Sequence, residues 1–189
     1  MANELIQILT FLIDNKGTKF SIRKLSIIRG INYKSAYNAI LKLREEGSVT
    51  LEKLGNTTLC SFSGKLSPRV FTAEFMRRAK LLKNPNFKVL YSKLNKINMP
   101  FIALLFGSFA KKEAGKFSDI DLLVIAEETK AAEQAISLLP LNIHLTAIKT
   151  SEFLEMAKSR EFTVVSEAIK RNILLVGIED YYRLMENVV

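Results

Sequence analysis

Residues 107–125 decide the fold of this chain, and they read GSFAKKEAGKFSDIDLLVI. The stretch opens on a Gly-Ser turn that follows an apolar strand, and it closes on a second apolar strand that begins with Asp119 and Asp121. Strand side chains alternate between the two faces of a sheet, so we expect the two aspartates on one face and Ile120 on the other. Two adjacent carboxylates repel each other unless a cation lies between them, and their oxygens suit a divalent ion such as Mg²⁺.

The Gly-Ser turn adds the second half of a binding site. A turn at which a strand passes into a helix offers backbone N–H groups and the positive end of a dipole to phosphate oxygens. A site that combines this turn with paired carboxylates suits a metal-bound nucleoside triphosphate.

This combination of turn, spacer and Asp-x-Asp strand resembles the nucleotidyltransferase superfamily named after DNA polymerase beta, and within it the minimal nucleotidyltransferases of prokaryotes. The resemblance covers roughly residues 87–150. It implies that Asp119 and Asp121 ligate Mg²⁺, or Mn²⁺ in its place. The residues that it assigns to the nucleotide are Gly107, Ser108, Lys111, Lys112 and Ser118. Lys112 stands where many relatives have glycine.

The chain departs from the family pattern at the third carboxylate, which active members supply from a strand shortly downstream. That strand is expected at residues 141–148, where apolar and polar side chains alternate and no acid is present. His144, the only histidine of the chain, occupies the expected place. It could act as a base or as the ligand of a softer metal, or it could simply fill the site. Two-metal transfer needs anionic ligands around both ions, so catalysis is an open question.

The first sixty residues predict three helices and a β-hairpin. Leu5, Leu9 and Leu12 recur at helical spacing, and further helices are expected over residues 22–29 and from residue 32 or 33 to 46. Two alternating segments around Gly55 then indicate the hairpin. This order resembles a winged helix-turn-helix, which lays its third helix in the major groove of DNA. The residues that the resemblance places at double-stranded DNA are Tyr33, Lys34, Ser35, Tyr37, Asn38, Lys42, Lys53 and Asn56.

The charge distribution agrees with a polyanionic partner for the front of the chain. The formal net charge is +9, made up of +5 over residues 1–66, +7 over 67–98 and −3 over 99–189. We therefore expect a winged helix-turn-helix domain at 1–66, a helical connector at 67–98 and a nucleotidyltransferase-like domain at 99–189. The fold class is α+β in two domains, the second a mixed sheet flanked by helices.

The apolar runs, the N-terminal residues and the single cysteine indicate where in the cell the protein is expected. The apolar runs are too short for a membrane span, and the first ten residues resemble the start of an amphipathic helix rather than a signal peptide. The single cysteine, Cys60, fits a reducing cytoplasm and is expected to pack in the core.

Three hypotheses for function follow. The chain is a DNA-binding transcriptional regulator whose second domain binds nucleotide, or it is an active transferase that moves a nucleotide onto a protein or nucleic acid. The third is an antitoxin that neutralises a toxin partner by binding it. Winged-helix proteins commonly bind paired half-sites, so a homodimer is also expected.

Overall fold

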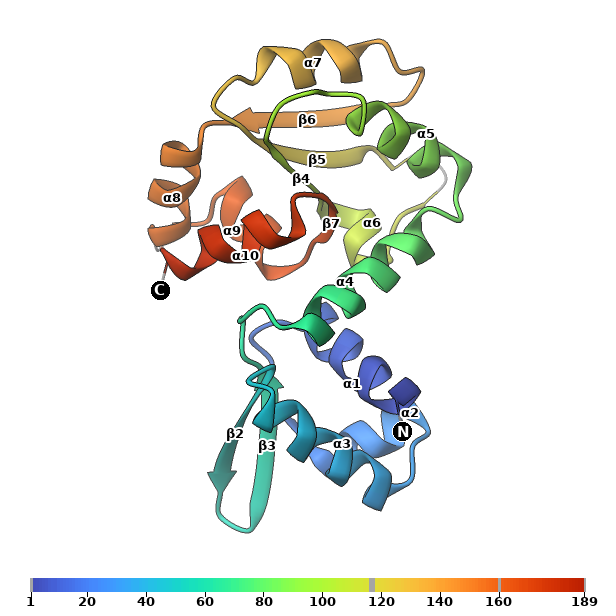
Figure 1. Ribbon diagram of the computed structural model, residues 1–189, viewed down its shortest axis with the longest axis vertical. Coiled ribbons are helices and arrows are strands. Elements are labelled where there is room, and N and C mark those ends of the chain that lie inside the picture. Colours follow the sequence, from blue (N-terminus) through green and yellow to red (C-terminus); the bar gives the residue numbers. More distant parts are fainter. Residues whose placement is uncertain (1, 116–117, 160, 189) are drawn as a thin grey trace. The chain divides into compact units, whose positions relative to one another are not determined.

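The computed structural model describes residues 2–115, 118–159 and 161–188 (Figure 1). The chain divides into two compact units, Met1–Phe75 and Met76–Val189. The division falls inside helix α4 (Pro68–Leu81), within the stretch that was expected to connect two domains. Of the helices in the described ranges, none has both the length and the apolar character that crossing a membrane needs.

The first unit opens with three helices, and side-chain caps begin the second and the third. They are α1 (Ala2–Asp14), α2 (Ile22–Arg29) and α3 (Tyr33–Glu45). Ser21 accepts a hydrogen bond from the backbone N–H of Lys24 at the start of α2, and Asn32 does the same for Lys34 in α3. Gly30 ends α2 in the left-handed conformation at φ 62°. The predicted helices are confirmed.

A three-stranded antiparallel sheet completes this unit, in the order β1-β3-β2. Its strands are β1 (Phe20–Ser21), β2 (Val49–Leu54) and β3 (Thr57–Phe62). Leu54 pairs with Thr57, so the predicted hairpin closes with a two-residue loop whose first member, Gly55, has φ 56°. The pairing of β1 with β3 was not predicted, because two residues are too short for a strand pattern.

The second unit is a mixed four-stranded sheet in the order β6-β5-β4-β7. β4 pairs antiparallel with β5 and β7, and β5 pairs parallel with β6. Its strands are β4 (Ile102–Leu105), β5 (Ile120–Ile125), β6 (Ile143–Ile148) and β7 (Ile173–Val176). Its helices after α4 are α5 (Pro85–Leu94), α6 (Gly107–Lys111), α7 (Lys130–Ser137), α8 (Thr150–Lys158), α9 (Val164–Lys170) and α10 (Ile178–Glu186).

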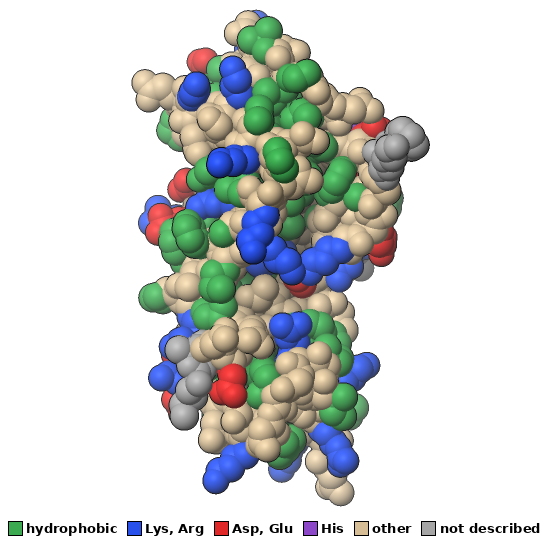
Figure 2. Space-filling view, turned by 90° about the vertical axis from the view of Figure 1, so that its right-hand side faces the viewer, with side chains coloured by type: hydrophobic (Ala, Val, Ile, Leu, Met, Phe, Trp, Pro, Cys, Tyr) green, Lys and Arg blue, Asp and Glu red, His purple; other side chains and the backbone are tan. Residues whose placement is uncertain are grey.

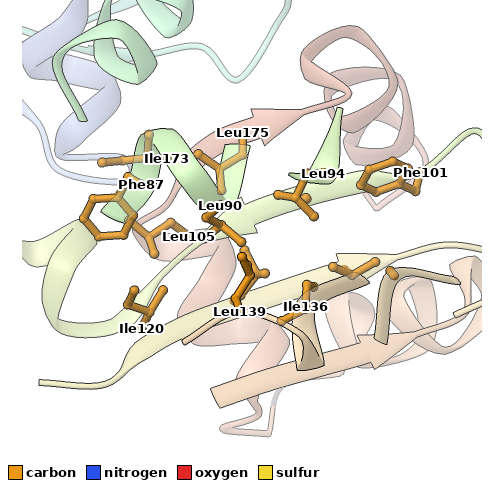
Figure 3. Packing of buried hydrophobic residues seen from close by; sticks show 14 of the residues in the cluster. Phe87, Leu90, Leu94, Phe101, Leu105, Ile120, Ile136, Leu139, Ile173 and Leu175 are labelled. Atoms are coloured by element: carbon orange, nitrogen blue, oxygen red, sulfur yellow. The ribbon is translucent and has the colours of Figure 1, made fainter. Parts of the chain in front are cut away.

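Helices cover both faces of this sheet. On one face, α5 and α7 bury an apolar cluster against the strands, in which Leu90, Leu105, Ile136 and Leu175 lie together (Figure 3). On the other side of the sheet lie α8, α9 and α10 (Figure 1). With apolar contacts on both faces, β5 is an almost continuous hydrophobic run, and only its first residues carry carboxylates.

Candidate functional site

The Gly-Ser turn lies directly against the second aspartate. β4 ends at Leu105, and Gly107 begins α6 with φ 65°. A Cβ atom added to Gly107 would lie 1.9 Å from Oδ2 of Asp121 and 2.7 Å from its Cγ. The backbone N–H of Phe106 also donates to the carbonyl oxygen of Asp121 at 3.0 Å. Any larger residue at this position would have to displace the Asp121 carboxylate and would also strain the backbone, so glycine is strongly favoured here.

The two aspartates lie at the start of β5, as the alternation predicts. Asp119 directly precedes the strand and is exposed, whereas the side chain of Asp121 is 26% exposed. Ile120 between them is buried in the core cluster on the opposite face. The carboxylate pair therefore lies on one face of the sheet, and Asp121 is the member that adjoins the turn.

The neighbouring strand β6 and the residue just before it place one polar side chain beside each carboxylate. In the parallel register Asp121 lies opposite His144, and the ring Nδ1 of His144 is 3.4 Å from Oδ1 of Asp121. Asn142 donates a hydrogen bond from its amide to Oδ1 of Asp119. His144 thus lies beside the aspartates, with its side chain 68% exposed.

The carboxylates of Asp119 and Asp121 fit a metal ion shared with a bound nucleotide better than a metal ion held by the protein alone. Across the described ranges, the structure contains no group of three or more His, Cys, Asp or Glu side chains suited to holding a metal ion. Mg²⁺, however, is commonly bound by one or two carboxylates together with the phosphates of a substrate. Asp119 and Asp121 supply such carboxylates next to the Gly-Ser turn. The residues therefore fit an ion that is shared with a nucleotide, rather than an all-protein metal cage.

The two lysines assigned to the nucleotide lie on and after α6. Lys111 forms an ion pair with Glu167 of α9, with Nζ 2.6 Å from Oε1, and the hydrogen bond to Glu167 raises the pKa of Lys111. Lys112 ends α6 with φ 63°, and no other non-glycine residue of the described chain has a positive φ. Glycine adopts this left-handed conformation more readily than lysine does.

Ser118 lies one residue before the aspartate pair. Its hydroxyl accepts a hydrogen bond from the backbone N–H of Gly115 at 2.9 Å. The quoted motif also contains residues 116 and 117, which lie outside the described residues. The hydroxyl of Ser118, assigned to the nucleotide by the resemblance, therefore already has a backbone partner in Gly115.

Sequence reasoning missed two polar residues that contact the predicted site. Asn142 contacts Asp119 and Glu167 contacts Lys111, each from a segment remote in sequence. The alternation of residues 141–148 could have identified Asn142, because it lies on the same face as His144 two residues earlier. Glu167 had no such signal, because the packing of α9 next to α6 is a tertiary contact.

The second group of predicted site residues lies on α3 and the hairpin. Ala36, Ala39, Ile40 and Leu43 form the buried face of α3. Of the residues that were predicted to meet DNA, Ser35 is half-buried and the others are exposed, namely Tyr33, Lys34, Tyr37, Asn38, Lys42, Lys53 and Asn56. The rings of Tyr33 and Tyr37 lie side by side with centroids 6.3 Å apart. On the face of the molecule in Figure 2, basic side chains outnumber acidic ones, in line with the net charge.

Comparison with known proteins identifies the second unit. Residues 88–181 match the family model described as polymerase beta, nucleotidyltransferase. Searches of curated proteins and of solved structures gave no match. The matched range contains the Gly-Ser turn, both aspartates and the strands that position them. Residues 88–181 of this chain therefore form a nucleotidyltransferase-type domain of the polymerase beta kind.

Proposed function

We propose that the nucleotidyltransferase-type domain binds a nucleoside triphosphate together with a divalent cation. Gly107 and Ser108 would lie against the phosphates, and Asp119 and Asp121 would share the cation with them. The observation that carries this proposal is the contact between the Asp121 carboxylate and Gly107, where a Cβ would lie 1.9 Å from Oδ2. That contact supports the proposal because it places the Asp121 carboxylate directly beside the Gly-Ser turn. Mg²⁺ is the expected ion, with Mn²⁺ as a substitute.

Lys111 and Lys112 would neutralise part of the triphosphate charge. Lys111 already has an anionic partner in Glu167 at 2.6 Å. A phosphate would therefore compete with this carboxylate for the ammonium group, so the contribution of Lys111 to nucleotide affinity is expected to be small. The Ser118 hydroxyl already accepts a hydrogen bond from the backbone N–H of Gly115, so its contribution to nucleotide affinity is also expected to be small.

We further propose that the first unit is a winged helix-turn-helix that binds double-stranded DNA. Support comes from the exposed polar face of α3 opposite its buried apolar face, and from the hairpin that follows. Lysine contacts to phosphate would supply affinity, whereas Asn38 and the tyrosines could reach base edges. The whole chain would then be a cytoplasmic transcriptional regulator whose second domain binds nucleotide.

Calorimetric titration with a nonhydrolysable triphosphate and Mg²⁺ tests the nucleotide site. The wild-type chain should bind, and Asp121→Asn should weaken binding at least about tenfold, because the variant loses one anionic ligand. Asp180→Asn is the matched control, because Asp180 is an exposed acid on α10 and its loss should leave affinity unchanged. No binding by the wild-type chain, or equal affinity in Asp121→Asn, would refute the nucleotide site.

The DNA proposal has a separate test in the salt dependence of binding. Lys42→Ala should weaken binding to duplex DNA and should reduce the slope of log K against log salt by about 1, as expected for one lost phosphate contact. Lys65→Ala removes an exposed lysine outside α3 and the hairpin, so it should change neither quantity. Absence of any duplex binding at low salt would rule out this function.

A second candidate function, transfer of a nucleotide onto an acceptor, is supported by the Gly-Ser turn beside the aspartates and by His144, which could act as the base. His144 lies 3.4 Å from Asp121, in the place expected for the third carboxylate. The acceptor would be a protein, such as a toxin partner, or a nucleic acid. Labelled ATP supplied with Mg²⁺ or Mn²⁺ should then label a component of a cell lysate, and Asp121→Asn should abolish that labelling. His144→Asp restores a third acid, so it should raise metal affinity and any transfer rate.

A further inference from the structure

The two edge strands of the second unit's sheet differ in what covers their outer backbone groups. At the β7 edge, two arginines of α4 bond to backbone carbonyls: Arg77 donates to Asn172 at 2.5 Å and Arg78 donates to Leu175 at 2.8 Å. At the opposite edge, within the described residues, β6 pairs with β5 alone. An edge strand offers unpaired N–H and C=O groups, which proteins normally cover or protect.

The outward backbone groups of β6 belong to alternate residues. The carbonyls of Asn142 and Ile148 accept hydrogen bonds from the N–H groups of Ile120 and Ala126, so the even-numbered residues of this strand direct their backbone groups at β5. The period of two then aims the N–H and C=O groups of Ile143, Leu145 and Ala147 away from the sheet. These groups form a regular edge with the spacing that another strand requires.

The side chains of β6 carry none of the usual protection of an edge. The strand reads IHLTAI, without lysine, proline or a carboxylate, and its pairing with β5 runs without a bulge from Ile143 to Ile148. Natural edge strands are generally short, charged, bulged or covered to prevent pairing with another chain. An unprotected edge of six residues favours pairing with a strand of another chain.

The strand is also complementary to itself. If two copies meet antiparallel about a two-fold axis perpendicular to the sheet, Leu145 lies opposite Leu145, and Ile143 lies opposite Ala147 of the second copy. In this register the outward backbone groups face each other as hydrogen-bonded pairs. Apolar side chains meet apolar ones on the core face, and His144 meets Thr146 on the polar face. A register shifted by one residue would place apolar side chains on the polar face.

We propose that the chain forms a two-fold dimer in which β6 pairs antiparallel with β6 of a second copy, making one continuous sheet. The same surface patch serves both copies, so the assembly closes on itself. The dimer also extends the candidate site, because Thr146 of the second copy would stand beside His144, with Cα atoms about 4.5 Å apart. This interface differs from a dimer formed through the first unit, and it does not depend on nucleotide or DNA binding.

Sedimentation equilibrium of the full chain tests the proposal. The wild-type chain should be a dimer, and Ala147→Pro should be a monomer, because proline removes an outward N–H group while leaving the bonds between β5 and β6 intact. Ala147→Val keeps the N–H group and should stay dimeric. A monomeric wild-type chain, or a dimeric Ala147→Pro variant, would overturn the proposal.

Amide hydrogen exchange of the wild-type chain gives a second test. It needs no variant, so it remains valid if Ala147→Pro fails to fold. In the dimer the amides of Ile143, Leu145 and Ala147 should be protected, and dilution below the dissociation constant should accelerate their exchange while the amides of β5 stay protected. Rapid exchange of these amides at high protein concentration would contradict the pairing. Protection that appears only after addition of another protein would assign the edge to a foreign strand and would also contradict it.

Discussion

Substitution of Gly107 by alanine should disrupt the candidate site without changing its net charge. The added Cβ would lie 1.9 Å from Oδ2 of Asp121, whereas ordinary contacts begin near 3.4 Å, so the carboxylate must move by about 1 Å or more. The backbone adds a second cost, because φ is 65° and a left-handed conformation costs alanine about 1–2 kcal/mol. We expect nucleotide affinity in the presence of Mg²⁺ to fall at least about tenfold, which corresponds to about 1.4 kcal/mol.

Two glycine controls separate these effects. Gly115→Ala lies in the loop after α6, its φ is not positive, and its nearest neighbour would be the Ser118 hydroxyl at 4.0 Å, so affinity and stability should be unchanged. Gly30→Ala has φ 62° and no atom within 4 Å, so it should show the backbone cost alone, in the first unit.

A double-mutant cycle then isolates the clash between Gly107 and Asp121. In the Asp121→Ala background, Gly107→Ala should lose the clashes with Oδ2 and Cγ and retain the backbone cost and the close 3.1 Å contact with the Cβ of residue 121. The resulting difference in stability loss can be measured by thermal or urea unfolding of the four chains. Gly107→Ala binding nucleotide as tightly as the wild-type chain would refute the argument. So would an equal stability loss in both backgrounds, because the carboxylate would then not adjoin the turn.

Three further predictions concern stability and reactivity. Lys112→Gly should raise the free energy of unfolding by about 1 kcal/mol in urea denaturation, because lysine is held at φ 63°; no gain would mean that its side chain offsets the strain. The bidentate hydrogen bonds from Arg69, at 2.6 and 2.8 Å, lower the pKa of Glu46, so this pair stabilises the fold above the ordinary glutamate pKa and the stabilisation is lost as the pH falls through the lowered value. Arg69→Met should therefore cost up to about 1 kcal/mol at pH 7 and almost nothing in acid; a loss that is equal at both pH values would contradict the pair. Burial raises the pKa of Cys60 to about 12, so the native chain should react with thiol reagents at neutral pH only as it unfolds, and rapid labelling of the native chain would show that the thiol is accessible.

Local sequence patterns predicted most of the elements, because each of these elements carries its own signal. The spacing of Leu5, Leu9 and Leu12 and the glycine at position 30 give the first helices, and the alternation around Gly55 gives the hairpin. The packing role expected of Cys60 is confirmed by its burial. Helix α7 was not predicted. It is short and lacks a side-chain cap, although the parallel pairing of β5 with β6 requires a crossover connection of this kind.

The sequence by itself determined that Asp119 and Asp121 share one face of a strand, because strand periodicity depends only on neighbouring residues. It also determined that a glycine-led turn follows a buried strand. Only the tertiary structure decided that Asp121 lies against Gly107, that Asn142 and His144 adjoin the two carboxylates, and that Glu167 pairs with Lys111. Those contacts depend on strand register and on helix packing, which bring together segments more than a dozen residues apart that no local pattern connects.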